Sequence, residues 1–223
     1  MTHTLHRQGD EAELGRDFVI MAISAQGINS KGSAAKFKRF SEIILKHNPV
    51  SFGDMKVGNM FTTGAKEVMA GHQDNSIAHG VFTDEETVVK VLNELKRADI
   101  GLSIVVSGLV SKTAECCARS GLRPHTVEYS LGVFGRTRKL PCRDVLEIAT
   151  MCGHGMVGFA LIEDHADKVA TGEVSPEDAA RALAGQCQCG ILNPERAARL
   201  LKALAAKKRM NLSPAAPERE TES

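Results

Sequence analysis

The sequence contains few aromatic residues: it has no tryptophan, one tyrosine and eight phenylalanines among 223 residues. Proteins that bind single-stranded nucleic acids commonly stack the bases on aromatic side chains. The formal net charge is only +1, so the chain also lacks the surplus of basic residues that attracts a phosphate backbone. These two deficits together argue against nucleic acid as a partner.

The chain also lacks an apolar run long enough to cross a membrane. Its longest apolar runs, FVIMAIS and LSIVVSGLV, have the length of buried strands. The N-terminal sequence MTHTLHRQGDEAELGRD lacks the basic start and apolar centre of a secretory signal. We therefore expect a cytoplasmic protein without a membrane partner. In that compartment its six cysteines stay reduced and form no disulfide framework.

The pattern over residues 17–140 predicts an α/β or α+β domain with a small sheet flanked by helices. Compact apolar runs predict strands, and apolar residues at helical spacing predict helices. Between residues 124 and 135, Val127, Tyr129 and Leu131 alternate with polar residues, which is typical of a half-buried strand. The main expected elements are strands over 17–24, 100–109 and 124–135, and helices over 34–48 and 82–99.

After residue 140 the pattern becomes entirely helical, which predicts an all-helical subdomain over residues 141–209. Ser175 precedes Pro176 at the start of one helix, a favourable cap and first turn. Residues 1–16 and residues 210–223 are polar and are expected to form flexible tails.

Two cysteine motifs, each surrounded by glycine, lie in this helical part. The first is TMCGHGMVGF over residues 150–159, and the second is QCQCG over residues 186–190. Because consecutive helices joined by short loops commonly run antiparallel, the two motifs can meet at one end of the helical subdomain. We therefore expect Cys152, Cys187 and Cys189 to lie close together.

Three thiolates suit two kinds of metal site. Cys152, Cys187 and Cys189 can hold a [4Fe–4S] cluster and leave one iron open to substrate. With His154 as a fourth ligand, the same three cysteines can instead form a closed tetrahedral zinc site. Cys142 is a weaker candidate for the fourth ligand. A third interpretation is a metal-free enzyme that uses one reactive thiol.

Glycines beside the cysteines let the backbone approach a bound group closely. We expect Gly153, Gly155 and Gly190 to contribute to cofactor binding in this way. We also expect Cys152 to lie just before a helix, where free backbone N–H groups and the positive end of the helix dipole stabilise a thiolate.

Other polar residues are candidates for handling a substrate. His125 and His79 lie in predicted loop or strand-edge positions and can move protons near neutral pH. Arg136 and Arg138 lie in a basic stretch between the two halves of the chain, and Lys31 lies in a glycine-rich loop before a helix. We expect these three cations to bind an anionic group.

The sequence thus predicts a cytoplasmic metalloprotein that acts as an enzyme. Its cofactor would be a three-cysteine [4Fe–4S] cluster, and its substrate a small anionic metabolite. Such a site suits elimination, dehydration (lyase) or sulfur-transfer chemistry. The alternatives are a structural zinc protein with a regulatory or protein-interaction role, and a metal-free thiol enzyme. Homo-oligomerisation stays open.

Overall fold

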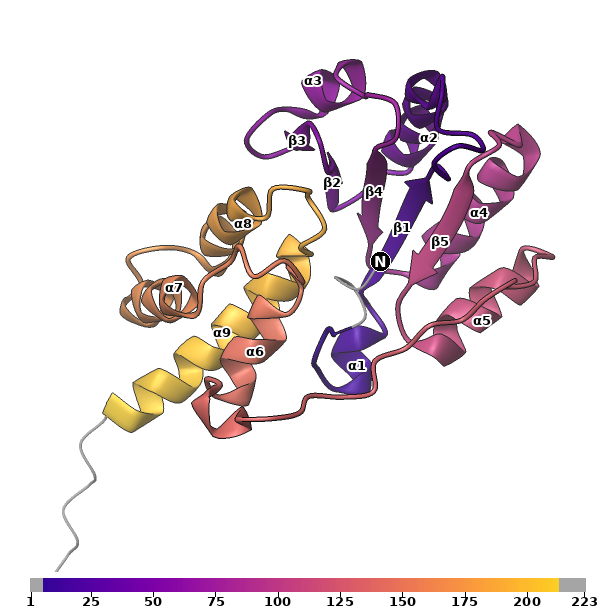
Figure 1. Cartoon of the computed structure of the whole chain (residues 1–223). Helices are drawn as coiled ribbons and strands as arrows, with labels where there is room; N and C mark the ends of the chain where they lie inside the picture. Colours follow the sequence, from indigo (N-terminus) through magenta and orange to yellow (C-terminus); the bar gives the residue numbers. More distant parts are fainter. Residues whose placement is uncertain (1–5, 213–223) are drawn as a thin grey trace, which may run out of the picture.

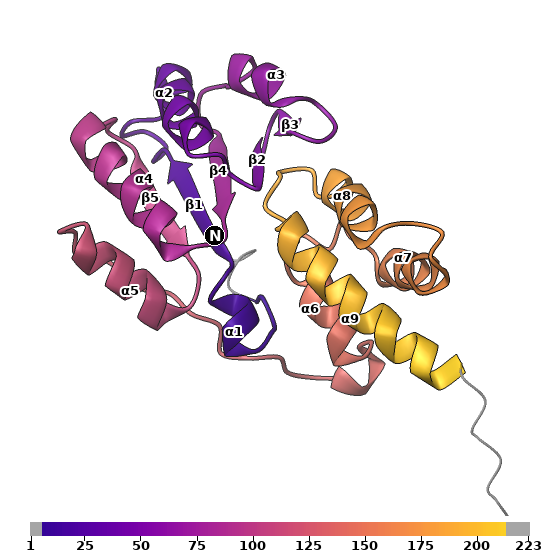
Figure 2. The same cartoon turned by 180° about the vertical axis from the view of Figure 1, so that it is seen from behind.

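The computed structural model describes residues 6–212. A five-stranded sheet lies between two groups of helices (Figures 1 and 2). Every strand pair in it is antiparallel, and the strand order is β3-β2-β4-β1-β5. The strands are β1 (Phe18–Ile23), β2 (Ser51–Asp54), β3 (Gly58–Asn59), β4 (Ile77–Phe82) and β5 (Ser103–Ser107). This confirms the predicted small sheet flanked by helices.

The two faces of the sheet pack against different helices because successive side chains of a strand point to opposite sides. Phe18 and Ile20 of β1 belong to an apolar core shared with the first group of helices. Val19 and Met21, which alternate with them, belong to a second core shared with the C-terminal helices. The sheet is therefore buried on both faces.

The first group of helices follows the pattern that the sequence predicts. Phe37 and Phe40 of α2 pack in the same core as Val88 of α4. Asp84 caps α4, because its side chain accepts a hydrogen bond of 2.8 Å from the Thr87 amide. The helices in this part of the chain are α2 (Ser33–Lys46), α3 (Ala65–Ala70), α4 (Glu85–Ala98) and α5 (Val110–Arg119).

The C-terminal helices form the predicted helical part and lie on the other side of the sheet (Figures 1 and 2). Ser175 caps α8 as expected, accepting a hydrogen bond of 3.1 Å from the Asp178 amide. The helices are α6 (Arg143–Ala149), α7 (Phe159–Thr171), α8 (Pro176–Gln186) and α9 (Pro194–Leu212). No helix within residues 6–212 is long and apolar enough to cross a membrane.

The predicted strand over residues 124–135 is wrong. This segment contains two bends and no helix or strand. Val127, Tyr129 and Leu131 are 58%, 68% and 81% exposed. The sheet ends at β5, so within the described chain these alternating residues have no strand with which to form a hydrogen-bonded ladder. Alternation alone cannot create a strand without such a partner.

The predicted flexible tails differ from the structure on both sides. Residues 6–16 contain a short helix, α1 (Glu11–Leu14), and Arg7, whose side chain is buried. Contacts with the C-terminal part, which the sequence pattern does not reveal, hold this segment. At the other end, α9 continues to Leu212, past the predicted start of the tail at residue 210. Residues 1–5 and 213–223 lie outside the described part of the chain.

Buried polar side chains connect β2 with α2 and with the loop before β4. The His72 ring lies 2.6 Å from Ser41 Oγ through Nε2 and 2.8 Å from Asp54 Oδ2 through Nδ1. Ser76 also donates to Asp54, at 2.6 Å. Although this order of groups resembles a hydrolytic triad, Ser41 is fully buried and cannot meet a substrate. The arrangement therefore holds the fold together.

Burial alone would raise the pKa of Asp54, but hydrogen bonds from His72, Ser76 and the Lys56 amide outweigh it and lower the pKa. A carboxylate with a lowered pKa stabilises the fold above its unfolded-state pKa. That contribution is lost as the pH falls toward the folded-state pKa.

We predict that Asp54→Ala lowers the free energy of unfolding by about 3 kcal/mol, because buried donors lose their acceptor. Urea denaturation at neutral pH measures the loss. The free energy of unfolding of Asp54→Ala should also fall less than that of the wild type as the pH is lowered into the acid range. Glu42→Ala, which removes an exposed ion pair with Arg39, should change stability little. Equal effects of the two substitutions would contradict this interpretation.

Candidate sulfur site

The two cysteine motifs meet in the folded chain. Cys152 follows α6, Cys187 is the C-cap of α8, and Cys189 lies two residues further. All three side chains are buried in the core shared by the sheet and the C-terminal helices. The Cys187 thiol is within hydrogen-bonding reach of both Cys152 and Cys189. Cys187 thus neighbours one thiol of its own loop and one from a segment about 35 residues earlier in the chain.

The hydrogen bonds between the thiols shift their three pKa values differently. The hydrogen bond to Cys187, together with burial, raises the pKa of Cys152. The hydrogen bond from Cys152 lowers the pKa of Cys187, but the bond to Cys189 and burial outweigh it and raise that pKa to about 11. The hydrogen bond from Cys187 lowers the pKa of Cys189 despite burial. Cys189 is therefore the thiol that loses its proton first.

His154 lies next to Cys189, the thiol with the lowered pKa. Its Nδ1 lies 3.8 Å from Cys189 Sγ. Cys187 thus neighbours both other thiols, and Cys189 also neighbours His154. Within residues 6–212, no group of three or more His, Cys, Asp or Glu side chains is arranged to hold a metal ion.

Backbone N–H groups from the loops point at the sulfurs. The amides of His154 and Met156 donate to Cys152, and the amide of Ile191 donates to Cys187 and Cys189. These donors replace the helix start that we expected next to Cys152. That expectation is wrong, because α7 begins only at Phe159. Amide donors of this kind stabilise sulfur that carries negative charge.

The loop with Cys187 and Cys189 rests on the backbone of β2 and β3. Ser51 Oγ donates to the Gly190 carbonyl at 2.7 Å, and Asn59 Nδ2 donates to the Cys187 carbonyl at 3.0 Å. Gly190 has a φ of +73°, and a Cβ there would lie 2.6 Å from the Phe52 carbonyl oxygen. The contact with the sheet therefore requires glycine at position 190.

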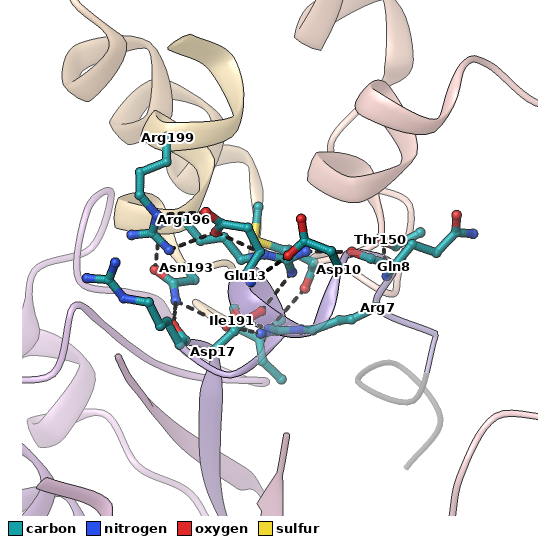
Figure 3. A network of polar contacts seen from close by, with 12 residues as sticks. Arg7, Gln8, Asp10, Glu13, Asp17, Thr150, Ile191, Asn193, Arg196 and Arg199 are labelled. Carbon is teal, nitrogen blue, oxygen red and sulfur yellow. Dashed lines mark hydrogen bonds and ion pairs between the residues drawn. The ribbon is translucent and has the colours of Figure 1, made fainter. Parts of the chain in front are cut away.

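A buried ionic network joins both cysteine motifs to the N-terminal segment (Figure 3). Arg7 forms an ion pair with Asp17 and donates to the carbonyls of Met151 and Ile191. Arg196 also donates to Asp17, at 2.9 Å. Burial alone would raise the pKa of Asp17, but Arg7 and Arg196 outweigh it and lower the pKa.

The sequence pattern did not identify Ser51, Asn59, Arg7 or Asp17. Each contributes through a contact with a distant backbone carbonyl or with a charge across the chain, and such contacts leave no local motif. A buried Asp directly before a strand and an Arg in a polar N-terminal stretch are individually unremarkable. Only the fold shows that they act on the cysteine loops.

Of the two predicted proton-transfer residues, one lies on the sheet face that packs in the same core as the cysteines. His79 is buried in β4 and pairs with Gly53 of β2 in the strand register. It shares a face with Val81, which packs in the same core as the three cysteines. His125 is exposed and lies beside β5 and α5, along an open cavity of about 790 Å³.

The remaining candidates lie in various parts of the surface. Gly153 and Gly155 are exposed in the turn after Cys152. Arg136 and Arg138 are exposed at a short 3-10 helix (Thr137–Lys139), and Lys31 is exposed in the loop before α2. None of these three cations belongs to the core that contains the cysteines. Cys142 is exposed at the start of α6.

No protein-family model, curated protein or solved structure matches this chain. The interpretation of the site therefore depends on its own geometry.

We predict that two glycine substitutions near the sulfurs differ in effect. Gly155→Ala should cost about 1 kcal/mol, because φ is +69° but the space around it is open. Gly190→Ala should cost about 3 kcal/mol, because it adds a clash with Phe52 to the same backbone strain. Urea denaturation gives both values.

Iodoacetamide should also alkylate Cys187 and Cys189 faster in Gly190→Ala than in Gly155→Ala. Similar stability and alkylation rates for the two variants would show that the loop does not rest on the sheet.

Proposed function

We propose that this protein is an enzyme that binds a [4Fe–4S] cluster through Cys152, Cys187 and Cys189 and acts on a small anionic metabolite. One observation carries the proposal: three buried thiols from two separate motifs come together around Cys187 and receive backbone N–H groups. Packing alone gives no reason to direct amide donors at thiols, whereas sulfur that binds iron carries negative charge and accepts such bonds.

The donor set fits the cofactor in its chemistry. Binding iron requires deprotonated thiols. Loss of the protons removes the S–H hydrogen bonds that link Cys187 to Cys152 and Cys189. The amides of His154, Met156 and Ile191 remain as donors to the thiolates. The protein thus supplies both the ligands and the groups that compensate their charge.

A cluster with three protein ligands supplies an iron that can bind an oxygen or sulfur atom of a substrate as a Lewis acid. This suits elimination, dehydration or sulfur transfer. His79 is the better placed of the two candidate proton carriers, because it shares the sheet face that packs with the cysteines. The roles of His125, Arg136, Arg138 and Lys31 stay predictions. A cytoplasmic location would keep all six cysteines reduced.

The contact between His154 and Cys189 favours a second candidate. Three cysteines and one histidine are a common ligand set for structural zinc. In that case the metal would stabilise the loops, and the protein would be a regulatory or interaction module.

Metal analysis of protein purified without air tests the proposal. We predict about four iron and four sulfide per chain, with a broad absorption band near ~400 nm. Cys152→Ala, Cys187→Ala and Cys189→Ala should each lose iron and colour. Cys116→Ala is the matched control, because Cys116 is buried in the other core, and it should retain both.

Two other results would contradict the cluster. About one zinc per chain without colour would support the Cys₃His zinc site instead. No metal, even after reconstitution with iron and sulfide, would refute both metal sites. That result would favour a metal-free enzyme with Cys189 as its reactive thiol, because Cys189 is the only one of the three whose pKa is lowered.

A further inference from the structure

We propose that Arg7 is a positioning residue that holds the two cysteine motifs together. This proposal deepens the function proposed above and rests on it for the metal. One guanidinium group donates to two carbonyls: that of Met151, which precedes Cys152 in the first motif, and that of Ile191, which directly follows the second motif. Arg7 therefore links the two loops directly, from a third segment of the chain (Figure 3).

These two carbonyls control where the neighbouring groups point. The Met151 carbonyl belongs to the peptide unit that ends at the Cys152 nitrogen, so fixing it fixes the start of the Cys152 backbone. Ile191 supplies the amide that donates to Cys187 and Cys189. A hydrogen bond to its carbonyl limits the rotation of the same residue. Arg7 thereby restrains the peptide before Cys152 and the residue whose amide donates to Cys187 and Cys189.

Arg7 is itself fixed in place. Its side chain is 6% exposed and pairs with Asp17, which is fully buried. Asp17 also accepts from Asn193 at 3.1 Å and from Arg196 at 2.9 Å. Moving the Arg7 guanidinium would leave that buried carboxylate with less compensation, at a high cost. The position of the guanidinium is therefore set independently of the cysteines.

Lysine cannot reproduce this arrangement. Arg7 uses Nη1 for Asp17 and Nη2 for the two carbonyls. An ammonium group is a single point on a shorter, flexible stem, so it can keep the charge beside Asp17 without spanning both carbonyls. Arg7→Lys therefore separates the bridging role from the neutralisation of Asp17.

Cadmium binding by the full-length protein tests the proposal, with Cd²⁺ alone as the probe. Cd²⁺ bound to thiolates gives an ultraviolet charge-transfer band whose growth reports affinity. We expect Arg7→Lys and Arg7→Gln to weaken Cd²⁺ binding about 10- to 100-fold, the usual effect of removing an outer contact of a metal site. Arg199→Gln is the control: it breaks the pair with Glu13 on the same side of α9 and should leave Cd²⁺ affinity within about twofold of wild type.

A second readout needs no metal. Amide hydrogen exchange should accelerate at residues 152–156 and 187–191 in both Arg7 variants, and not in Arg199→Gln. A lower melting temperature with unchanged Cd²⁺ affinity and unchanged exchange at these loops would overturn the proposal. If Arg7→Gln fails to fold, Arg7→Lys, which retains the charge beside Asp17, decides the question.

The two proposals fail in different ways. If the wild-type protein binds neither Cd²⁺ nor iron, the proposed function fails, while loop exchange in the Arg7 variants still tests the positioning role. If the wild-type protein binds metal and the Arg7 variants bind it equally well with unchanged exchange, the positioning role fails alone.

Discussion

The buried carboxylate of Asp17 is the centre on which the arrangement of this protein depends. It lies immediately before β1 and is neutralised by Arg7 from the N-terminal segment and Arg196 from α9. A buried charge without partners costs several kcal/mol, so these three segments are held near one another. Arg7 and Arg196 then also bond to backbone carbonyls, which extends the constraint from side chains to loops. The sheet and the C-terminal helices consequently meet in one orientation.

The three cysteines lie where the sheet packs against the C-terminal helices. β2 and β3 support the loop with Cys187 and Cys189 through Ser51 and Asn59. Arg7 ties the same loop to the turn with Cys152. The thiols thus lie in the helical part, but the side chains that support their loops come from the first half of the chain. An isolated helical part would keep its cysteines and lose these contacts.

The sequence pattern predicted the features that depend on residues close together in the sequence. The helices follow from apolar spacing and from caps such as Ser175, and the central strands from short apolar runs. The approach of the two cysteine motifs follows from helices joined by short loops. Contacts between distant residues could not be read in the same way. From the sequence, residues 6–16 are a polar tail. In the structure they are held by Asp17 and by carbonyls of the C-terminal part. Residues 124–135 alternate like a strand, but the sheet ends at β5 without them.

The ion pair between Asp17 and Arg196 joins residues 179 positions apart, and the bond from Arg7 to Ile191 spans 184 positions. Contacts of such long sequence separation form late, because the chain must first close the large loop between them. During synthesis, the first half of the protein emerges from the ribosome well before α9. The sulfurs therefore reach their final arrangement only when translation has passed residue 196. Cys152 is made long before Cys187 and Cys189, the two thiols that it joins in the folded chain.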